Sequence, residues 1–318
     1  TGEDTLSLHD ALPIYNTEDA DLDNDFPRLP IADDPGARDA LAAQWREMQQ
    51  VRRSLNDQGV ELAKRDNAWQ PLIPAFAVTS GGDLTIHPGG RVTAGGTLPV
   101  GVVYTLTAPA PSGLTALKLE IFPDQADPKS WPERASVLSH LNLTLAGMDG
   151  KKTGIKLKEV IGDFLAGPFD PQESLEGGPG GFGSYPAQAG GRWCVVILEE
   201  PLLTAAEDRL EIMLKQGAVS NANQQACTLR DFSLTTTTAV HWTALAGSPE
   251  RRAVWDRYHG LKEEIRKVAS TNVPVLLERP TPAQRGTRIW LRGNRLTKDA
   301  AVQPGVPERL NPDRKSVV

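Results

Sequence analysis

The sequence Ser112-Gly-Leu-Thr-Ala-Leu-Lys-Leu-Glu-Ile-Phe-Pro-Asp124 has the alternating pattern of a half-buried β-strand. Apolar side chains recur at every second position, at Leu117, Leu119 and Ile121. Lys118 and Glu120 stand between them and point to the opposite face, because successive side chains of a strand alternate. Gly113 and Pro123 supply turn chemistry at the two ends. The stretch therefore predicts a core strand of a sheet, and it contains no nucleophile, metal-ligand set or phosphate-binding loop.

Short segments of the same kind occur on both sides of this stretch, throughout residues 67–240. They are rich in Val, Ile, Leu and Thr, and clusters of Gly, Pro, Asn and Asp separate them. The ranges expected as strands are 75–80, 83–86, 102–107, 115–122, 138–145, 193–198, 209–215 and 227–236. Many short strands with frequent turns are typical of a β-sandwich or jelly roll rather than of alternating βαβ units. The predicted fold class is therefore mainly β.

Two helices are predicted, one on each side of the β span, at residues 34–66 and 248–270. Each begins with a capping residue followed by proline, at Asp34 and at Ser248. Apolar residues follow near-heptad stripes: Leu41, Trp45, Met48, Leu55 and Leu62 in the first helix, and Val254, Tyr258, Leu261, Ile265 and Val268 in the second. Such a seam packs against another helix. We therefore expect an antiparallel helical hairpin with the sandwich inserted at its tip.

The composition is that of a globular protein and argues against two classes of partner. The 318 residues include 34 Lys and Arg against 40 Asp and Glu, a formal net charge of −6. A duplex nucleic acid needs clustered positive charge, so no nucleic-acid partner is expected. No apolar run reaches the roughly 20 residues that a membrane span needs. Cys194 and Cys227 lack metal-ligand spacing, and we expect two buried thiols, with a bridge in an oxidising compartment as the alternative.

Both ends of the chain resemble translated sequencing-adapter read-through. Residues 1–14 contain Leu-Ser-Leu-His-Asp-Ala-Leu-Pro-Ile, and residues 313–318 end in Arg-Lys-Ser-Val-Val. We expect that the native chain continues in both directions and that these two segments take no part in the fold. Residues 15–33 are rich in aspartate and are interpreted as an acidic linker at the end of a preceding domain.

Recognisable motifs for catalysis or nucleotide binding do not emerge from the sequence. Residues 178–183, Gly-Pro-Gly-Gly-Phe-Gly, satisfy the pattern G-x-G-x-x-G. A dinucleotide site needs this turn to open a helix, whereas here Pro186 and further glycines follow. The five histidines form no metalloprotease or haem-attachment motif. We therefore assign no catalytic, metal-binding or cofactor-binding residue, and whether the protein is an enzyme stays open.

Three aromatic residues in predicted loops are candidates for ligand binding: Trp131, Phe182 and Tyr185. An exposed ring on a loop of a sandwich can stack against the face of a sugar. The alternative is that these rings plug the ends of the sandwich, because aromatic side chains mostly serve cores.

The C-terminal part of the sequence carries a more specific resemblance. Arg288-Ile-Trp-Leu-Arg-Gly-Asn294, followed by Val302-Gln-Pro-Gly-Val-Pro307, is similar to the opening of the C-terminal domain of the large planctomycete cytochrome-c proteins. Those chains combine haem domains with planctomycete-specific domains of unknown function, termed PSCyt and PSD. Residues 272–312 are accordingly interpreted as the start of the C-terminal PSD domain.

Further matches extend this resemblance over nearly the whole chain. Tyr15-Asn-Thr-Glu-Asp-Ala-Asp resembles the end of the preceding domain in that family, and Trp69-Gln-Pro-Leu resembles its β module. The β module is also matched by Gly113-Leu-Thr-Ala-Leu-Lys-Leu-Glu and by Gly191-Arg-Trp-Cys-Val-Val-Ile-Leu-Glu-Glu-Pro-Leu. Residues 177–191 replace a segment that the related module often has before its last strands, so a ligand site built by that segment is not carried over.

The resemblance implies a galactose-binding-like jelly roll in a periplasmic or cell-surface protein. Haem is expected elsewhere in the parent protein and not in these residues. Partners implied are other domains of the same parent chain and a polysaccharide. Three hypotheses follow: a non-catalytic sandwich module that binds sugar or acts as a spacer, a scaffold for a redox or polysaccharide-degrading active site outside this fragment, and an assembly module that acts through the helical hairpin.

Overall fold

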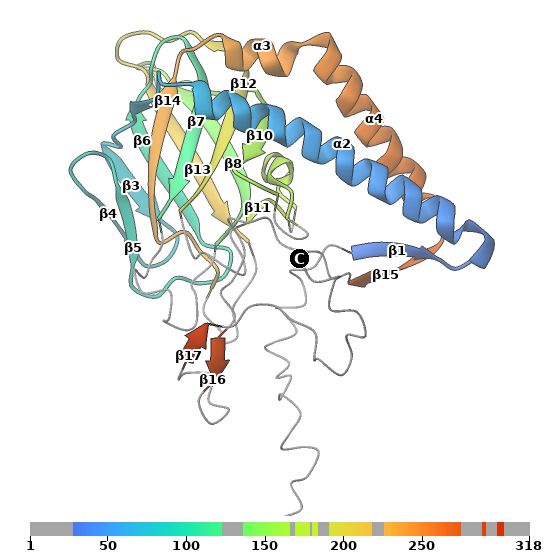
Figure 1. Ribbon diagram of the computed structural model, residues 1–318. Coiled ribbons are helices and arrows are strands. Elements are labelled where there is room, and N and C mark those ends of the chain that lie inside the picture. The colour runs from blue at the N-terminus through green and yellow to red at the C-terminus, as the bar shows by residue number, and fades with distance from the viewer. Residues whose placement is uncertain are drawn as a thin grey trace, which may run out of the picture.

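Two antiparallel sheets packed face to face form the core of the protein (Figure 1). The computed structural model describes residues 28–122, 136–165, 169–178, 180–183, 191–217, 226–274, 288–290 and 298–301. The predicted mainly β fold is confirmed, and it is sandwich-like. Among the described helices, none is long and apolar enough to cross a membrane.

The first sheet, which we call the helix-facing sheet, is covered on its outer side by helices. Its strands are ordered β10 (Leu157–Gly162), β12 (Arg192–Leu202), β7 (Leu114–Ile121), β14 (Asp231–Thr237), β5 (Val92–Gly95) and β4 (Asp83–Ile86), and β2 (Gln70–Pro71) pairs with β14. Residues 112–124 contain β7, which lies in the middle of this sheet. Leu119 lies between Cys194 of β12 and Leu234 of β14.

The second sheet, which we call the outer sheet, lies on the far side of the core. Its strands are ordered β11 (Phe182–Gly183), β8 (Val137–Ala146), β13 (Arg209–Gln216), β6 (Val103–Pro109) and β3 (Phe76–Thr79), and β9 (Lys152–Gly154) pairs with β8. Alternate residues of both sheets fill the space between them, as expected for a sandwich. Leu106, Leu143 and Ile212 from the outer sheet meet Leu119 and Leu234 in one cluster.

The predicted helices are present, and a third was missed. A short 3-10 turn, η2 (Pro35–Ala37), leads into α2 (Arg38–Arg65), and α3 (His241–Gly247) precedes α4 (Pro249–Arg266). Asp34 caps the first turn by accepting a hydrogen bond from the Gly36 amide at 3.0 Å. Ser248 caps α4 by accepting from the Arg251 amide at 3.1 Å. Both caps were expected from the Asp-Pro and Ser-Pro pairs.

α2 and α4 lie side by side and run in opposite directions, as three contacts along their length show. The Gln44 amide donates to Glu264 at 3.2 Å, and Arg257 pairs with Glu47 at 2.7 Å. Further along α2, the Arg251 guanidinium donates to the Leu55 carbonyl at 2.7 Å. The residue numbers of the contacting partners decrease along α4 as they increase along α2, so the two helices are antiparallel.

α3 and the C-terminal part of α2 lie on the helix-facing sheet, while the other end of the helical pair extends beyond the sandwich (Figure 1). A second apolar cluster joins Ala116, Val195 and Ile197 on the outer side of the sheet to Trp242 of α3. The C-terminal turns of α2 pack against the same cluster. This cover explains why the burial of β7 departs from strict alternation: Ala116 is as buried as Leu117. Lys118 and Glu120, beyond the cover, are partly exposed and pair at 2.7 Å.

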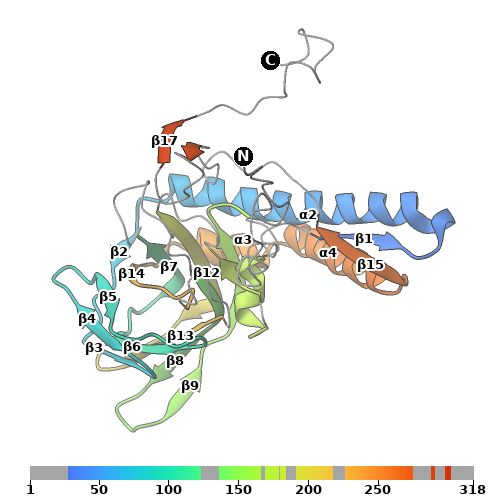
Figure 2. The ribbon, with the colours of Figure 1, turned by 90° about the horizontal axis from the view of Figure 1, so that it is seen from below.

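A two-stranded ribbon closes the far end of the helical pair (Figure 2). β1 (Arg28–Ala32) and β15 (Ser270–Pro274) pair in antiparallel register, with Arg28 opposite Pro274 and Ala32 opposite Ser270. Ala32 is fully buried, and β1 packs against α2. The sequence interpretation assigned residues 15–33 to a linker and residues 272–312 to another domain, so this pairing across the two was not foreseen.

The remaining segments are described only in part. β16 (Arg288–Trp290) and β17 (Lys298–Ala301) form a separate two-stranded pair. The two adapter-like ends, residues 1–14 and 313–318, lie outside the described residues, as does most of the predicted C-terminal domain. Cys194 and Cys227 are buried and do not form a disulfide, which is the arrangement expected from the sequence.

Candidate functional site

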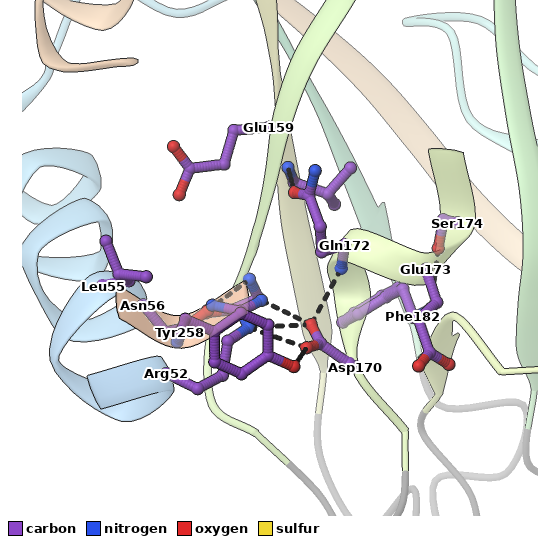
Figure 3. A network of polar contacts seen from close by, with 12 residues as sticks. Arg52, Leu55, Asn56, Glu159, Asp170, Gln172, Glu173, Ser174, Phe182 and Tyr258 are labelled. Atoms are coloured by element: carbon purple, nitrogen blue, oxygen red, sulfur yellow. Dashed lines mark hydrogen bonds and ion pairs between the residues drawn. The ribbon is translucent and has the colours of Figure 1, made fainter. Parts of the chain in front are cut away.

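The helical pair meets the sandwich at a buried polar joint beside β10 (Figure 3). The sandwich contributes β10 and the 3-10 turn η3 (Pro171–Leu175). Asp170 caps η3 by accepting from the Gln172 amide at 3.0 Å, and Pro171 suits the first position of the turn. The cap fixes the Asp170 carboxylate so that it faces α2.

Arg52 of α2 holds the Asp170 carboxylate in a two-pronged ion pair. Its Nε atom donates to Oδ2 at 2.8 Å, and the two side chains are 4% and 16% exposed. Burial alone would raise the pKa of Asp170, but the charge and hydrogen bonds of Arg52 outweigh burial and lower it. Burial, followed by the charge of Asp170, raises the pKa of Tyr258, whose hydroxyl donates to Asp170 at 3.4 Å. Tyr258 therefore stays a neutral phenol.

Arg251 of α4 and Glu159 of β10 form a second ion pair, buried more deeply than the first. The side chains are 1% and 2% exposed, and Nε of Arg251 donates to Glu159 at 2.9 Å. The same guanidinium donates to Gln58 at 2.9 Å and to the Leu55 carbonyl at 2.7 Å. One arginine therefore ties α4, α2 and the sandwich together, and its hydrogen-bonding capacity is used on all three.

Two amide side chains cover the outer edge of β10. Asn56 of α2 both donates to the Gly162 carbonyl at 2.8 Å and accepts from the Gly162 amide at 3.0 Å. Gln172 of η3 accepts from the Val160 amide at 2.8 Å and donates to the Lys158 carbonyl at 3.3 Å. These contacts imitate the next strand of a sheet and satisfy backbone groups that an edge strand would leave open.

A further arginine closes the end of the sandwich next to the joint. Arg192 pairs with Asp163 through side chains that are 4% and 10% exposed, and it donates to the Gly183 carbonyl at 2.9 Å. Its guanidinium lies 3.7 Å from the ring centroid of Phe164 and 5.2 Å from that of Phe182. Burial raises the pKa of Asp163, and Arg192 offsets that effect only in part.

The structure describes one of the three predicted ligand-stacking rings, Phe182. Phe182 lies in β11 and is 1% exposed, because it pairs opposite Leu138 and enters the core between the sheets. Its ring cannot stack on a sugar from solvent, and it plugs the end of the sandwich, the alternative left open above. Trp131 and Tyr185 lie outside the described residues.

The glycine-rich segment before β11 has a packing role. Gly181 has a φ of 130°, and a Cβ atom there would stand 2.1 Å from the Leu138 carbonyl oxygen. Ser174 bonds to both strands at this point: its hydroxyl donates to Leu138 at 2.9 Å and accepts from the Phe182 amide at 2.8 Å. Residues 181–183 therefore sit close against β8.

An open groove runs along the other side of α2. Its volume is about 620 Å³, and its lining is mainly the polar face of the helix: Gln50, Arg53, Ser54, Asp57, Gln58, Glu61 and, from α3, Leu245. The lining mixes both signs of charge and offers one apolar side chain. It therefore has no chemical character that selects a ligand class.

The joint is suited to holding parts together rather than to chemistry. Each carboxylate is matched by an arginine: Asp170 accepts hydrogen bonds from Arg52, and Glu159 accepts them from Arg251. Burial raises the pKa of Cys194, so this thiol is not a ready nucleophile. In the part of the chain that the structure describes, His, Cys, Asp and Glu nowhere gather in a group of three that could hold a metal ion.

Sequence reasoning missed the four charged residues of the joint, although a signal was present. The stripe Leu41, Trp45, Met48, Leu55 and Leu62 steps by four and three, and the two positions that complete it are Arg52 and Gly59. Arg251 similarly lies three residues before Val254 at the start of the second stripe. A charged residue in an apolar seam indicates a buried ion pair, because an unpaired charge there is costly.

Comparison with known proteins adds no assignment to this geometry. A scan against models of protein families finds no match to the chain, and a search of curated proteins finds no relative.

Proposed function

We propose that residues 28–274 form a non-catalytic β-sandwich module that is inserted into a larger chain. The pairing of β1 with β15 carries this proposal, because it brings the two ends of the unit together at Arg28 and Pro274. A unit whose ends are neighbours can be inserted in another domain without disturbing it. The buried joint then fixes the sandwich relative to the helical pair, so the module acts as one body.

The proposed architecture is a galactose-binding-like jelly roll at the tip of a helical hairpin. Four strands, β5, β7, β12 and β14, belong to the helix-facing sheet, and four others, β6, β8, β11 and β13, belong to the outer sheet. Their spatial orders, β5-β14-β7-β12 and β6-β13-β8-β11, support the proposal of an eight-stranded jelly roll. The antiparallel contacts between α2 and α4 support the hairpin.

The proposed parent is a large exported planctomycete cytochrome-c-type protein, in the periplasm or at the cell surface, with its haem outside these residues. Support comes from the sequence resemblance. Two of the matching motifs form β7 and β12, which are neighbouring strands, with Leu119 opposite Cys194. The motif that begins at Trp69 leads into β2, which pairs with β14 in the same sheet. The partners of the module in this proposal are other domains of the parent chain.

A polysaccharide is the proposed ligand class, with Trp131 and Tyr185 as the stacking candidates that remain. The test is binding of the full 318-residue chain to a glycan array. We expect binding that is lost in Trp131→Ala and kept in Phe76→Ala, which removes a ring that is 71% exposed on β3. Absence of binding to any glycan would refute the proposal that the ligand is a polysaccharide. The proposal of an inserted module has a separate test.

The test of the inserted module is limited proteolysis of the full chain, read by mass spectrometry. Proteases cut where the backbone opens locally, so a single cooperative unit resists internal cleavage. We expect a resistant core that begins near residue 28 and ends near residue 274. Early cleavage near residues 66 or 240 that releases the sandwich from the helices would contradict the proposal.

The buried joint also favours a scaffold role in an enzyme whose active site lies outside this fragment. A rigid coupling transmits the position of the parent domain to the sandwich, which a flexible linker does not. Deletion of residues 68–240 from the parent protein distinguishes the two functions. Loss of a redox or polysaccharide-degrading activity would favour the scaffold, whereas unchanged activity with lost glycan binding would favour the binding module.

A further inference from the structure

β3 is an edge strand that lacks the protection given to other edges of the sandwich. Among the described strands it pairs with β6 on one side and has no hydrogen-bonded neighbour on the other. The edge of β10, by contrast, is covered by Asn56 and Gln172. β9 carries Lys152, and β4 begins with Asp83. Proteins normally protect edge strands with charges, proline or covering elements, because open edges pair with other chains.

The side chains of β3 are also unusually apolar for an exposed strand. Phe76 and Val78 point to the same face and are 71% and 63% exposed. Ile73, just before the strand, and Val100, in the loop whose Pro99 lies against Gly81, are exposed as well. These four make up most of the exposed large apolar residues in the described part of the chain; the others are Met148, Leu203 and Val240. Such clustering marks an interaction surface.

The charge of the same segment favours a partner of its own kind. No charged side chain occurs from residue 67 to residue 82, although the chain has a formal net charge of −6. Two copies that meet at β3 therefore bring two segments without charged side chains together. Like charges placed directly opposite each other on neighbouring strands would oppose such pairing.

We propose that β3 is a self-association edge, at which two copies of this chain pair in antiparallel fashion about a two-fold axis. Side chains opposite each other on antiparallel strands share a face, so the register must place residues of equal parity together. One register that meets this condition places Ala77 opposite Ala77 of the second copy. In this register Phe76 of each copy lies opposite Val78 of the other. The outer sheet then continues across the dimer. This proposal is independent of the proposed function.

The short strand sets the strength of this contact. A strand of four residues offers a small contact compared with a standard interface, so we expect the dimer to be a weak one. Weak pairing at one edge is useful where copies are already concentrated at a surface, because local concentration replaces affinity. An isologous two-fold contact also closes on itself and does not propagate into fibres.

The first experiment is sedimentation equilibrium of the full chain from about 10 μM to 1 mM, a range in which weak dimers dissociate. We expect a monomer–dimer equilibrium that weakens at least tenfold in Val78→Lys. The matched control is Met148→Lys, which removes an equally exposed apolar side chain, 80% exposed, outside β3. A monomer over the whole range, or a dimer that persists in Val78→Lys, overturns the proposal.

The second experiment tests the register and does not depend on the lysine variant folding. Phe76→Cys and Val78→Cys chains are oxidised separately and as a mixture. We expect the disulfide-linked dimer to form several-fold faster in the mixture, because only there do the two cysteines face each other across the strands. Cys194 and Cys227 are buried and do not compete. Equal rates in all three samples would refute the register.

Discussion

The Arg251 guanidinium of α4 is paired with the Glu159 carboxylate of β10 through side chains that are 1% and 2% exposed. An ion pair this deep contributes little stability by itself, because both charges lose their hydration. Its consequence is geometric. If either residue moved away, the charge of the other would remain in the interior without a counter-charge. The contact between α4 and the sandwich therefore opens as a whole or stays closed.

We expect Glu159→Gln to destabilise the protein by about 3–5 kcal/mol, because it leaves the Arg251 charge buried without a counter-charge. Urea denaturation measures the loss as a lower midpoint at an unchanged slope. Glu47→Gln is the control: its pair with Arg257 has side chains 45% and 50% exposed, and such pairs contribute about 0.2–1 kcal/mol. Similar losses of stability in both variants would contradict this account of the Arg251–Glu159 pair.

The pair Arg52–Asp170 predicts a specific loss of stability in acid. The pKa of Asp170 in the folded protein lies below its ordinary value of about 3.9. A carboxyl of this kind contributes stability that is complete above the unfolded pKa and is lost as pH falls through the folded pKa. We therefore expect the difference in unfolding free energy between wild type and Asp170→Asn to be largest near neutral pH and to shrink below about pH 4. Urea denaturation measures this difference in unfolding free energy, and a value that stays constant between pH 7 and pH 2 would contradict the prediction.

Gly59 predicts an unusual response to alanine. It stands on α2 where a Cβ atom would lie 2.1 Å from Cδ1 of Ile161, so the glycine allows the helix to approach β10. Alanine normally stabilises a helix by about 0.8–1.0 kcal/mol over glycine. At Gly59 we expect overpacking to reverse the sign, with a net loss of about 1–3 kcal/mol.

Gly260 of α4 is the matched control for this substitution. It also lies inside a helix, but an added Cβ atom there would meet no atom within 4 Å. We therefore expect Gly260→Ala to raise the thermal midpoint while Gly59→Ala lowers it. Partial recovery in Gly59→Ala combined with Ile161→Val would tie the loss to this contact, and a gain in stability from Gly59→Ala would exclude it.

Sequence patterns located the regular elements well because their signals are local. The eight predicted strands all exist within a few residues of their expected bounds, except that β14 begins at Asp231 and not at Cys227. α2 and α4 follow their Asp-Pro and Ser-Pro caps. β10 was missed because four consecutive residues, Glu159 to Gly162, are buried on both faces, so the strand has no alternation. α3 was missed because no side chain caps its N-terminus.

The joint and the ribbon were beyond the reach of local patterns. Arg52 bonds to Asp170 across 118 residues, and Arg251 to Glu159 across 92, so no window of sequence contains both partners. β1 and β15 are short, and they become a recognisable pair only when α2 and α4 bring them together. Phe182 illustrates the converse: its glycine neighbours indicated a loop, yet they allow the close approach to β8 that buries the ring.

The last prediction concerns the covered edge of β10. Asn56 bonds the amide of Gly162 at 3.0 Å, and Gln172 bonds the amide of Val160 at 2.8 Å. An amide proton exchanges with solvent once its acceptor is removed and the backbone opens locally. We expect hydrogen exchange to accelerate at Gly162 in Asn56→Ala and at Val160 in Gln172→Ala, each by about five- to 150-fold, because the lost bond is worth about 1–3 kcal/mol.

Each variant serves as the control for the other, because the two side chains cover different residues of one strand. Exchange that rises at Gly162 alone in the first variant and at Val160 alone in the second shows that the amides act separately, as an artificial neighbouring strand. Equal acceleration at both positions in either variant would instead mean that β10 detaches as a unit. In that case Asn56 and Gln172 contribute to docking the helices and do not protect the edge of β10. The edges of β3 and β10 would then not differ in protection.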